Sequence, residues 1–142
     1  MPFFELNTPL DLFRKLEDDF RRLVDSGQDS RAAFNFFVTA EHLPDWLSRR
    51  DLVRQNDLLK VVSHLANGMK HFTIDPKRHK SVQSTQKDRY VEEGYFEPGY
   101  VEEPLQIVLS ADEAVSLGLP IIDAVSLGKR VLEFWRPLVP GA

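Results

Sequence analysis

One segment of the chain places several side chains that can bind anions or transfer protons on a single helical face. The segment runs from Asn56 to Phe72 and reads NDLLKVVSHLANGMKHF. At about 100° per residue, its apolar residues fall on one side, which is expected to face a core. We interpret the nearly opposite side as a candidate binding surface, and the alternative is an ordinary solvated helix face. This surface carries an ammonium, two imidazoles and a carboxamide, from Lys60, His64, Asn67 and His71.

The histidine spacing argues against a metal site built from this segment alone. His64 and His71 lie about 10 Å apart along the helix axis, which is too far for one ion without ligands from elsewhere. The sequence contains no cysteine, so disulfides, thiolate metal sites and cysteine nucleophiles are excluded. No phosphate-binding glycine loop, nucleophile elbow or metalloprotease helix is present. We therefore predict neither a metal nor a cofactor, and a small-molecule enzyme is the least favoured class.

A second polar pair lies on the preceding segment, which is apolar almost all round and is expected to be a buried helix. His42 and Asp45 are three residues apart there, and we interpret them as a hydrogen-bonded pair that fixes packing. Pro44 is expected to kink this helix or to end it early. Trp46 and Trp135 are expected to be core anchors.

Charge is distributed unevenly along the chain, although the formal net charge is only -4. Residues 70–89 carry six basic side chains and two acidic ones, whereas residues 92–113 carry seven acidic side chains and no Lys or Arg. We therefore expect one positive and one negative region, and the alternative is that both runs are solvated loops. The candidate nucleic-acid contacts in the basic run are Lys70, Lys77, Arg78 and Lys80.

Length and composition indicate one domain that spans residues 1–142. The chain is 42% hydrophobic and 28% charged, which is typical of soluble globular proteins and sufficient for one core. No apolar run approaches the ~20 residues that a membrane helix needs, and the N-terminus lacks the pattern of a secretory signal. We expect a cytoplasmic protein with no membrane partner.

The hydrophobic periodicity predicts a mainly α-helical, four-helix bundle-like fold. The helices are expected at residues 9 to about 27, 32–47, 56–72 and 120–135, the first one started by Thr8 and Pro9. A small β-hairpin insertion is expected at about 90–118, between the third and last helices, with strands at Leu105–Leu109 and Ala114–Leu117. Residues 48–55 are expected to be a polar connection or a frayed helix end, and residues 77–87 a loop.

The end of the third helix resembles a known family signature. The string ANGMKH, from Ala66 to His71, resembles the motif of the HEPN superfamily, the small α-helical domains of many toxins and antiviral ribonucleases. That motif is an arginine, a polar residue that is often asparagine, three variable residues and a histidine. Asn67 and His71 match it, and Ala66 stands where the arginine belongs. The segments NFFVTAEHLPDW, HKSV and VLEFW, at residues 35–46, 79–82 and 131–135, also resemble a group of uncharacterised bacterial proteins.

The HEPN resemblance implies a metal-independent endoribonuclease in which two subunits pair and place both motifs around one cleft. His71, with Asn67 beside it, would assist proton transfer, while the motif arginine would stabilise the phosphate as a ribose 2′-hydroxyl attacks it. Lys70 is a poor substitute for that arginine, because it lies about 100° round the helix from His71. The resemblance therefore favours binding over cleavage in this chain, and whether the chain is an enzyme stays open.

Two functional hypotheses follow from these observations. The first is a HEPN-like homodimeric domain that binds RNA or a nucleotide through the 60–71 surface and the basic 77–80 segment, with weak ribonuclease activity as a further option. It predicts binding that weakens with salt. The second is a non-enzymatic module in which the same helix and the acidic hairpin mediate homodimerisation or contact with a partner protein. It predicts a dimer that forms equally well with and without RNA.

Overall fold

The computed structural model describes residues 4–71, 82–87 and 105–142. Most of these residues are helical, which confirms the prediction of a mainly α-helical chain. The helices are α1 (Pro9–Asp25), α2 (Ser30–Trp46), α3 (Arg50–Gln55), α4 (Asp57–His71), α5 (Ala111–Leu117) and α6 (Ala124–Trp135), followed by the 3-10 turn η1 (Arg136–Leu138). In the described ranges, the strands β1 (Val82–Lys87), β2 (Leu105–Leu109) and β3 (Ile121–Asp123) form one antiparallel sheet in the order β1-β2-β3.

The two long N-terminal helices begin at side-chain caps that the sequence contains. Thr8 Oγ1 accepts a hydrogen bond from the Asp11 amide at 3.2 Å, and Asp11 Oδ2 accepts one from the Thr8 amide at 3.0 Å. This reciprocal pair is a capping box, and it satisfies amides that the first turn leaves without helical partners. Asp29 caps α2 by accepting from the Arg31 amide at 2.9 Å. Local chemistry therefore sets where α1 and α2 start.

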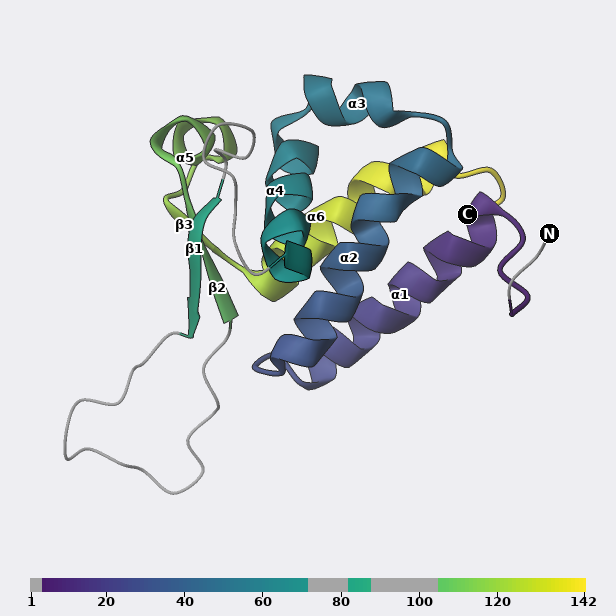
Figure 1. Cartoon of the computed structure of the whole chain (residues 1–142), viewed down its shortest axis with the longest axis horizontal. Coiled ribbons are helices and arrows are strands. Elements are labelled where there is room, and N and C mark those ends of the chain that lie inside the picture. The colour runs from purple at the N-terminus through teal and green to yellow at the C-terminus, as the bar shows by residue number, and fades with distance from the viewer. Residues whose placement is uncertain (1–3, 72–81, 88–104) are drawn as a thin grey trace.

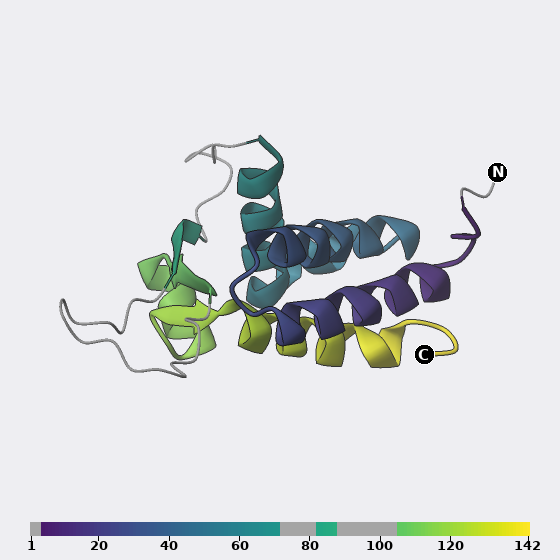
Figure 2. The same cartoon turned by 90° about the horizontal axis from the view of Figure 1, so that it is seen from below.

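Three helices form a layer that a fourth crosses. α1, α2 and α6 lie side by side with roughly aligned axes, and α4 stands steeply across them (Figures 1 and 2). Gly128 lets α6 approach α1 and α2 closely, because a Cβ at this position would come within 3.1 Å of ring atoms of Phe20 and Phe36. Trp135 is fully buried, as predicted. The other large, fully buried side chains include Phe13, Leu16, Phe36, Phe37, Leu127 and Val131.

The sheet lies at one end of this helical layer, next to α4 and α5 (Figure 1). The strand predicted at Leu105–Leu109 is confirmed as β2, and it pairs with β1 on one side and β3 on the other. Its residues Ile107 and Leu109 are buried, together with Ile122 of β3. The sheet therefore extends the core beyond the helices. No helix in the described ranges is long and apolar enough to cross a membrane.

Three predictions around the sheet are wrong. The hairpin strand expected at Ala114–Leu117 belongs to α5, which Ser110 caps at its start and Gly118 ends in a left-handed conformation with φ +82°. The loop expected over residues 77–87 contains β1 from residue 82 onwards. The last helix begins at Ala124 rather than Pro120, because Asp123 Oδ2 caps it by accepting from the Ser126 amide at 2.9 Å. Residues 72–81 and 88–104, which complete the predicted loop and hairpin insertion, lie outside the described residues.

The connection between the second and fourth helices also differs from the prediction. Residues 50–55 form the separate helix α3 rather than a polar connection or a frayed end. Pro44 lies inside α2, which continues to Trp46. The chain then turns through Ser48, a non-glycine residue with a positive φ of 54°. This turn brings Arg50 back toward the end of α2.

Candidate functional site

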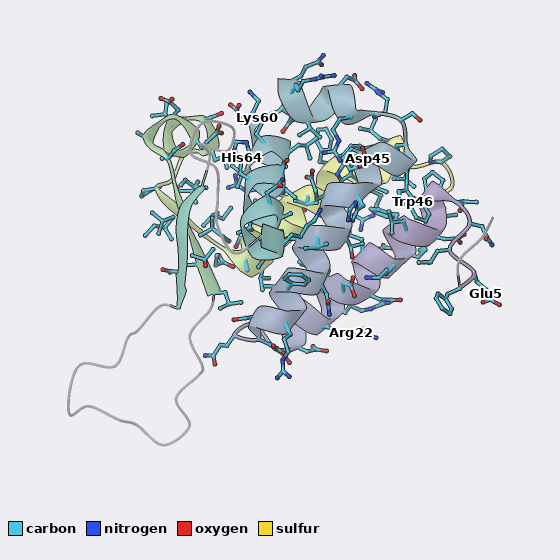
Figure 3. The ribbon with its side chains drawn as sticks, in the orientation of Figure 1. Glu5, Arg22, Asp45, Trp46, Lys60 and His64 are labelled. Carbon is cyan, nitrogen blue, oxygen red and sulfur yellow. The ribbon has the colours of Figure 1, made fainter. Side chains whose placement is uncertain are left out.

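Helix α4 has one buried side and one polar side. Leu59, Val61, Val62, Leu65 and Ala66 are at most 3% exposed. Lys60, His64 and Asn67 are half-buried, and Lys70 is exposed. His71 is the last residue of α4, but its side chain is not among those that the structure describes. Figure 3 shows Lys60 and His64 on the side of α4 that faces the sheet in this view.

The polar side chains of α4 are partly held by neighbours. Lys60 Nζ lies 3.6 Å from Asp57 Oδ1, one turn earlier. Asp57 also accepts a hydrogen bond from the Ser116 hydroxyl of α5. Asn67 Nδ2 donates to the Ser63 carbonyl at 3.0 Å, and Asn67 Oδ1 accepts no hydrogen bond from the described residues. Both side chains of the Lys60–Asp57 pair are partly exposed, so Lys60 can exchange Asp57 for another anion at a small cost in free energy.

A second polar cluster joins α2, α3 and α4. Arg50 Nη1 donates to Glu41 Oε1 at 2.7 Å, and Arg50 Nη2 donates to the Glu41 carbonyl at 2.9 Å. The same guanidinium contacts both carboxylate oxygens of Asp45, at 3.0 and 2.7 Å. Ser63 of α4 donates to Glu41 Oε1 at 3.2 Å. Glu41 is only 8% exposed, so Arg50 and Ser63 stabilise a carboxylate whose burial would otherwise be costly. We call Glu41, Asp45, Arg50 and Ser63 the Arg50 cluster.

The electrostatics of Asp45 connect this cluster to the end of α4. Hydrogen bonds from Arg50 are the largest cause that holds the pKa of Asp45 below its ordinary value, and partial burial opposes them. The positive charges of Arg50, His42 and Lys70 lower the pKa of Asp45 further. The charge of Lys70, in the last turn of α4, is the smallest of these causes.

Two predictions on α2 are wrong. His42 and Asp45 are both exposed, and Asp45 bonds to Arg50 instead of forming an internal pair with His42. Trp46 was expected in the core but is 40% exposed (Figure 3). The exposure of His42 and Asp45 and that of Trp46 have one cause. Other elements cover the last turn of α2 on fewer sides than its apolar composition indicates. Arg50 carries no distinguishing signal in the sequence, since a basic residue in a short connection can reach several carboxylates.

The structure brings some predicted site residues together and leaves others undescribed. Lys60, His64 and Asn67 share one side of α4, and Lys70 is exposed in the last turn of the same helix. Lys77, Arg78 and Lys80 lie outside the described residues. Within the described ranges, no group of three His, Asp or Glu residues is arranged to hold a metal ion. Chemically, the α4 side offers several hydrogen-bond donors and two cations, an arrangement suited to an anionic ligand.

Comparison with known proteins does not place the chain in a family, since no family model, no curated protein and no solved structure matches it.

Proposed function

We propose that the protein is a small HEPN-like helical domain, located in the cytoplasm, that binds RNA or a nucleotide through one face of α4. This α4 face is defined by Lys60, His64, Asn67, Lys70 and His71. The helices α1, α2, α4 and α6 serve as its four-helix bundle-like scaffold. The observation that carries the proposal is that Lys60, His64 and Asn67 lie along one side of a continuous helix, away from its buried residues, with Lys70 and His71 in its last turn.

The charge balance of the α4 face favours an anionic ligand. None of its five residues is acidic, and the carboxylates of Asp57 and Asp45 already have partners. Asp57 accepts from Ser116 and lies beside Lys60, and Asp45 is held by two hydrogen bonds from Arg50. The carbonyl end of α4 carries partial negative charge, which the ammonium group of Lys70 offsets. A phosphate group could therefore use the ammonium groups for charge and the amide and imidazole groups for hydrogen bonds.

The position of Ala66 limits the proposal to binding. Ala66 stands at the arginine position of the HEPN motif and is 0% exposed. A side chain at this position points into the core and does not reach a ligand on the opposite face. Lys70 is the nearest cation to His71 in sequence but lies about 100° away round the helix. We therefore do not extend the proposal to RNA cleavage.

Fluorescence anisotropy with a short labelled single-stranded RNA tests this proposal. If Lys60 and Lys70 each neutralise one phosphate, affinity should fall about sevenfold between 50 and 200 mM salt. Lys60→Ala and Lys70→Ala should each weaken binding. Lys129→Ala is the matched control, because it removes one exposed positive charge from α6. Equal losses for Lys129→Ala and the two α4 variants would show that α4 is not the binding surface.

A second candidate function is a non-enzymatic module for homodimerisation or protein interaction, and the exposure of Trp46 favours it. Tryptophan is enriched among the residues that dominate interface energetics, and Trp46 is 40% exposed. Light scattering of Trp46→Ala tests this candidate, with Phe34→Ala as control because Phe34 is also 40% exposed on the same helix. A dimer that forms without RNA, dissociates only in Trp46→Ala and shows no RNA binding would favour this candidate over the first.

A further inference from the structure

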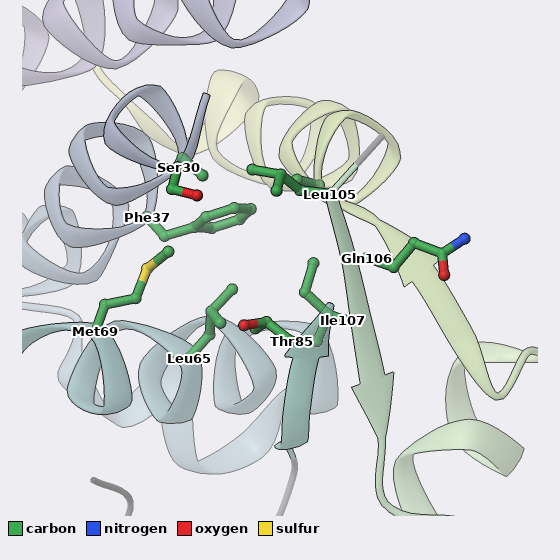
Figure 4. A pocket seen from close by; sticks show the side chains of 10 residues that line it. Ser30, Phe37, Leu65, Met69, Thr85, Leu105, Gln106 and Ile107 are labelled. Atoms are coloured by element: carbon green, nitrogen blue, oxygen red, sulfur yellow. The ribbon is translucent and has the colours of Figure 1, made fainter. Parts of the chain in front are cut away.

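A cavity of about 300 Å³ lies between α2, α4, the sheet and the start of α6. Phe37 of α2, Leu65 and Met69 of α4, and Leu105 and Ile107 of β2 are among the residues that line it. Figure 4 shows these five side chains pointing toward a common space, whereas Gln106 points away from it. None of the described lining residues belongs to the α4 face, so the cavity is separate from the surface proposed above.

The lining of the cavity is mainly apolar and combines buried apolar residues with the exposed residues Ser30 and Thr85. Phe37, Leu65 and Ile107 are at most 2% exposed. The polar side chains that line the cavity belong to Ser30, Thr85 and Gln106, and no charged side chain is found among the described lining residues. A charged ligand would therefore lose its hydration without gaining a counter-ion. The hydroxyl groups of Ser30 and Thr85 are available for one polar group of a ligand.

The volume of the cavity is large enough for a small-molecule ligand. Protein cores are packed to the density of organic crystals, and voids larger than a water molecule are few. Enclosed apolar cavities of about half this volume take up small apolar molecules, and this cavity is partly open to solvent, which gives a ligand a path of entry. A volume of about 300 Å³ also matches the lower end of the range of small-molecule sites, which are mostly apolar with a few polar groups.

From these observations we propose that the cavity binds a compact, neutral, mainly apolar molecule that carries at most one hydroxyl-like polar group. The ligand inserts between Phe37 and Met69 on the helices and Ile107 on β2. Its polar group lies toward the hydroxyl of either Ser30 or Thr85, which line the cavity from α2 and β1. This site is independent of RNA binding, and either one can exist without the other.

The chain contains a built-in reporter for this site. It has two methionines, Met1 and Met69, and Met69 lines the cavity. In protein labelled with ¹³C at the methionine methyl groups, we would titrate 2-naphthol, which is neutral at pH 7, and 2-naphthoate, a charged molecule of similar shape. The expected result is a saturable shift of the Met69 methyl resonance with 2-naphthol, no shift of Met1, and at least a tenfold weaker response to 2-naphthoate.

A cavity-filling variant provides the second measurement. Ala33 lines the cavity from α2 and is 2% exposed, so Ala33→Leu should occupy the space, abolish the 2-naphthol response and leave the melting temperature unchanged or higher. A lower melting temperature would show that the space is already filled. An absent Met69 shift, equal shifts at Met1 and Met69, or equal responses to the two naphthalene compounds would overturn the proposal.

Discussion

Arg50→Ala removes the cation that holds a buried carboxylate at the junction of α2, α3 and α4. In the native protein, Arg50 contacts the side chain of Glu41 at 2.7 Å and its carbonyl at 2.9 Å. After the substitution, the carboxylate of Glu41, which is 8% exposed, would keep only the Ser63 hydroxyl at 3.2 Å. We therefore expect a clear loss in the free energy of unfolding.

The magnitude follows from burial. Breaking a fully buried ion pair by removing one partner costs about 3–5 kcal/mol, but the Arg50 side chain is 35% exposed, so water can replace part of what is lost. Hydrogen bonds to charged groups contribute about 1.5–3 kcal/mol. The contact with Asp45 adds less than about 1 kcal/mol, because the Asp45 side chain is 55% exposed. We expect a total loss of about 2–3 kcal/mol.

Urea denaturation followed by circular dichroism at pH 7 measures this loss. Arg49→Ala is the matched control, since the adjacent Arg49 pairs with Asp51 while both side chains are more than 40% exposed, at 48% and 43%. That control should lose less than about 1 kcal/mol. A double-mutant cycle with Glu41→Gln should give a coupling energy of about 2 kcal/mol. If Arg50→Ala is no less stable than Arg49→Ala, the Arg50 cluster does not stabilise the junction and the reasoning is refuted.

Three further substitutions test packing, electrostatics and the motif position. Gly128→Ala should lower the free energy of unfolding by about 1 kcal/mol in urea, because overpacking of about 1–3 kcal/mol against Phe20 and Phe36 at 3.1 Å outweighs a helix gain of about 1 kcal/mol; a more stable variant would mean that the rings move apart. The lowered pKa of Asp45 means that its stabilising effect is present above its ordinary pKa of about 4 and is lost as the pH falls through the lower folded value. In thermal melts, the melting temperature of Asp45→Asn should therefore be lower than that of the wild type at pH 7 but equal to it near pH 2. An equal difference in melting temperature at the two pH values would contradict this. Ala66→Arg would bury an unpaired charge at a fully buried position, so it should cost more than about 3 kcal/mol without RNA cleavage, and a stable variant that cleaves RNA would contradict the geometry.

Elements whose signals are local could be predicted from the sequence. The Thr8 capping box starts α1, and the apolar run Leu105–Leu109 forms β2. The expected polar and apolar sides of α4 also match the burial of its residues, because a period of 3.6 residues fixes which side chains share a face. These features need no information about the rest of the fold.

Errors arose where two local signals compete. Residues 114–117 have strand-like composition, but the Ser110 cap and the left-handed Gly118 define a seven-residue helix around them. Residues 121–123 continue the apolar pattern of α6, yet the Asp123 cap delays the helix and leaves them free to pair with β2. In both cases the capping residue was present in the sequence and was given too little weight.

Parts of the site depend on tertiary structure and could not be predicted. The contacts of Arg50 with Glu41 and Asp45 require the turn at Ser48 and the packing of α4 against α2. The cavity depends on how far β2 lies from α2, which no spacing along the chain encodes. The Arg50 contacts and the cavity exist only once several elements have packed together. The polar side of α4, in contrast, follows from the sequence of a single helix.

The central claim, that the α4 face binds RNA, is tested most directly by two double variants of equal charge. Lys60→Ala/Lys70→Ala removes two cations from α4, and Lys129→Ala/Arg130→Ala removes two from α6. In anisotropy titrations with the same single-stranded RNA at about 50 mM salt, we expect the α4 variant to lose about tenfold or more in affinity, about 1.4 kcal/mol, and the α6 variant to stay within about twofold of the wild type. Equal losses in the two variants, or no binding by the wild type, would contradict the claim.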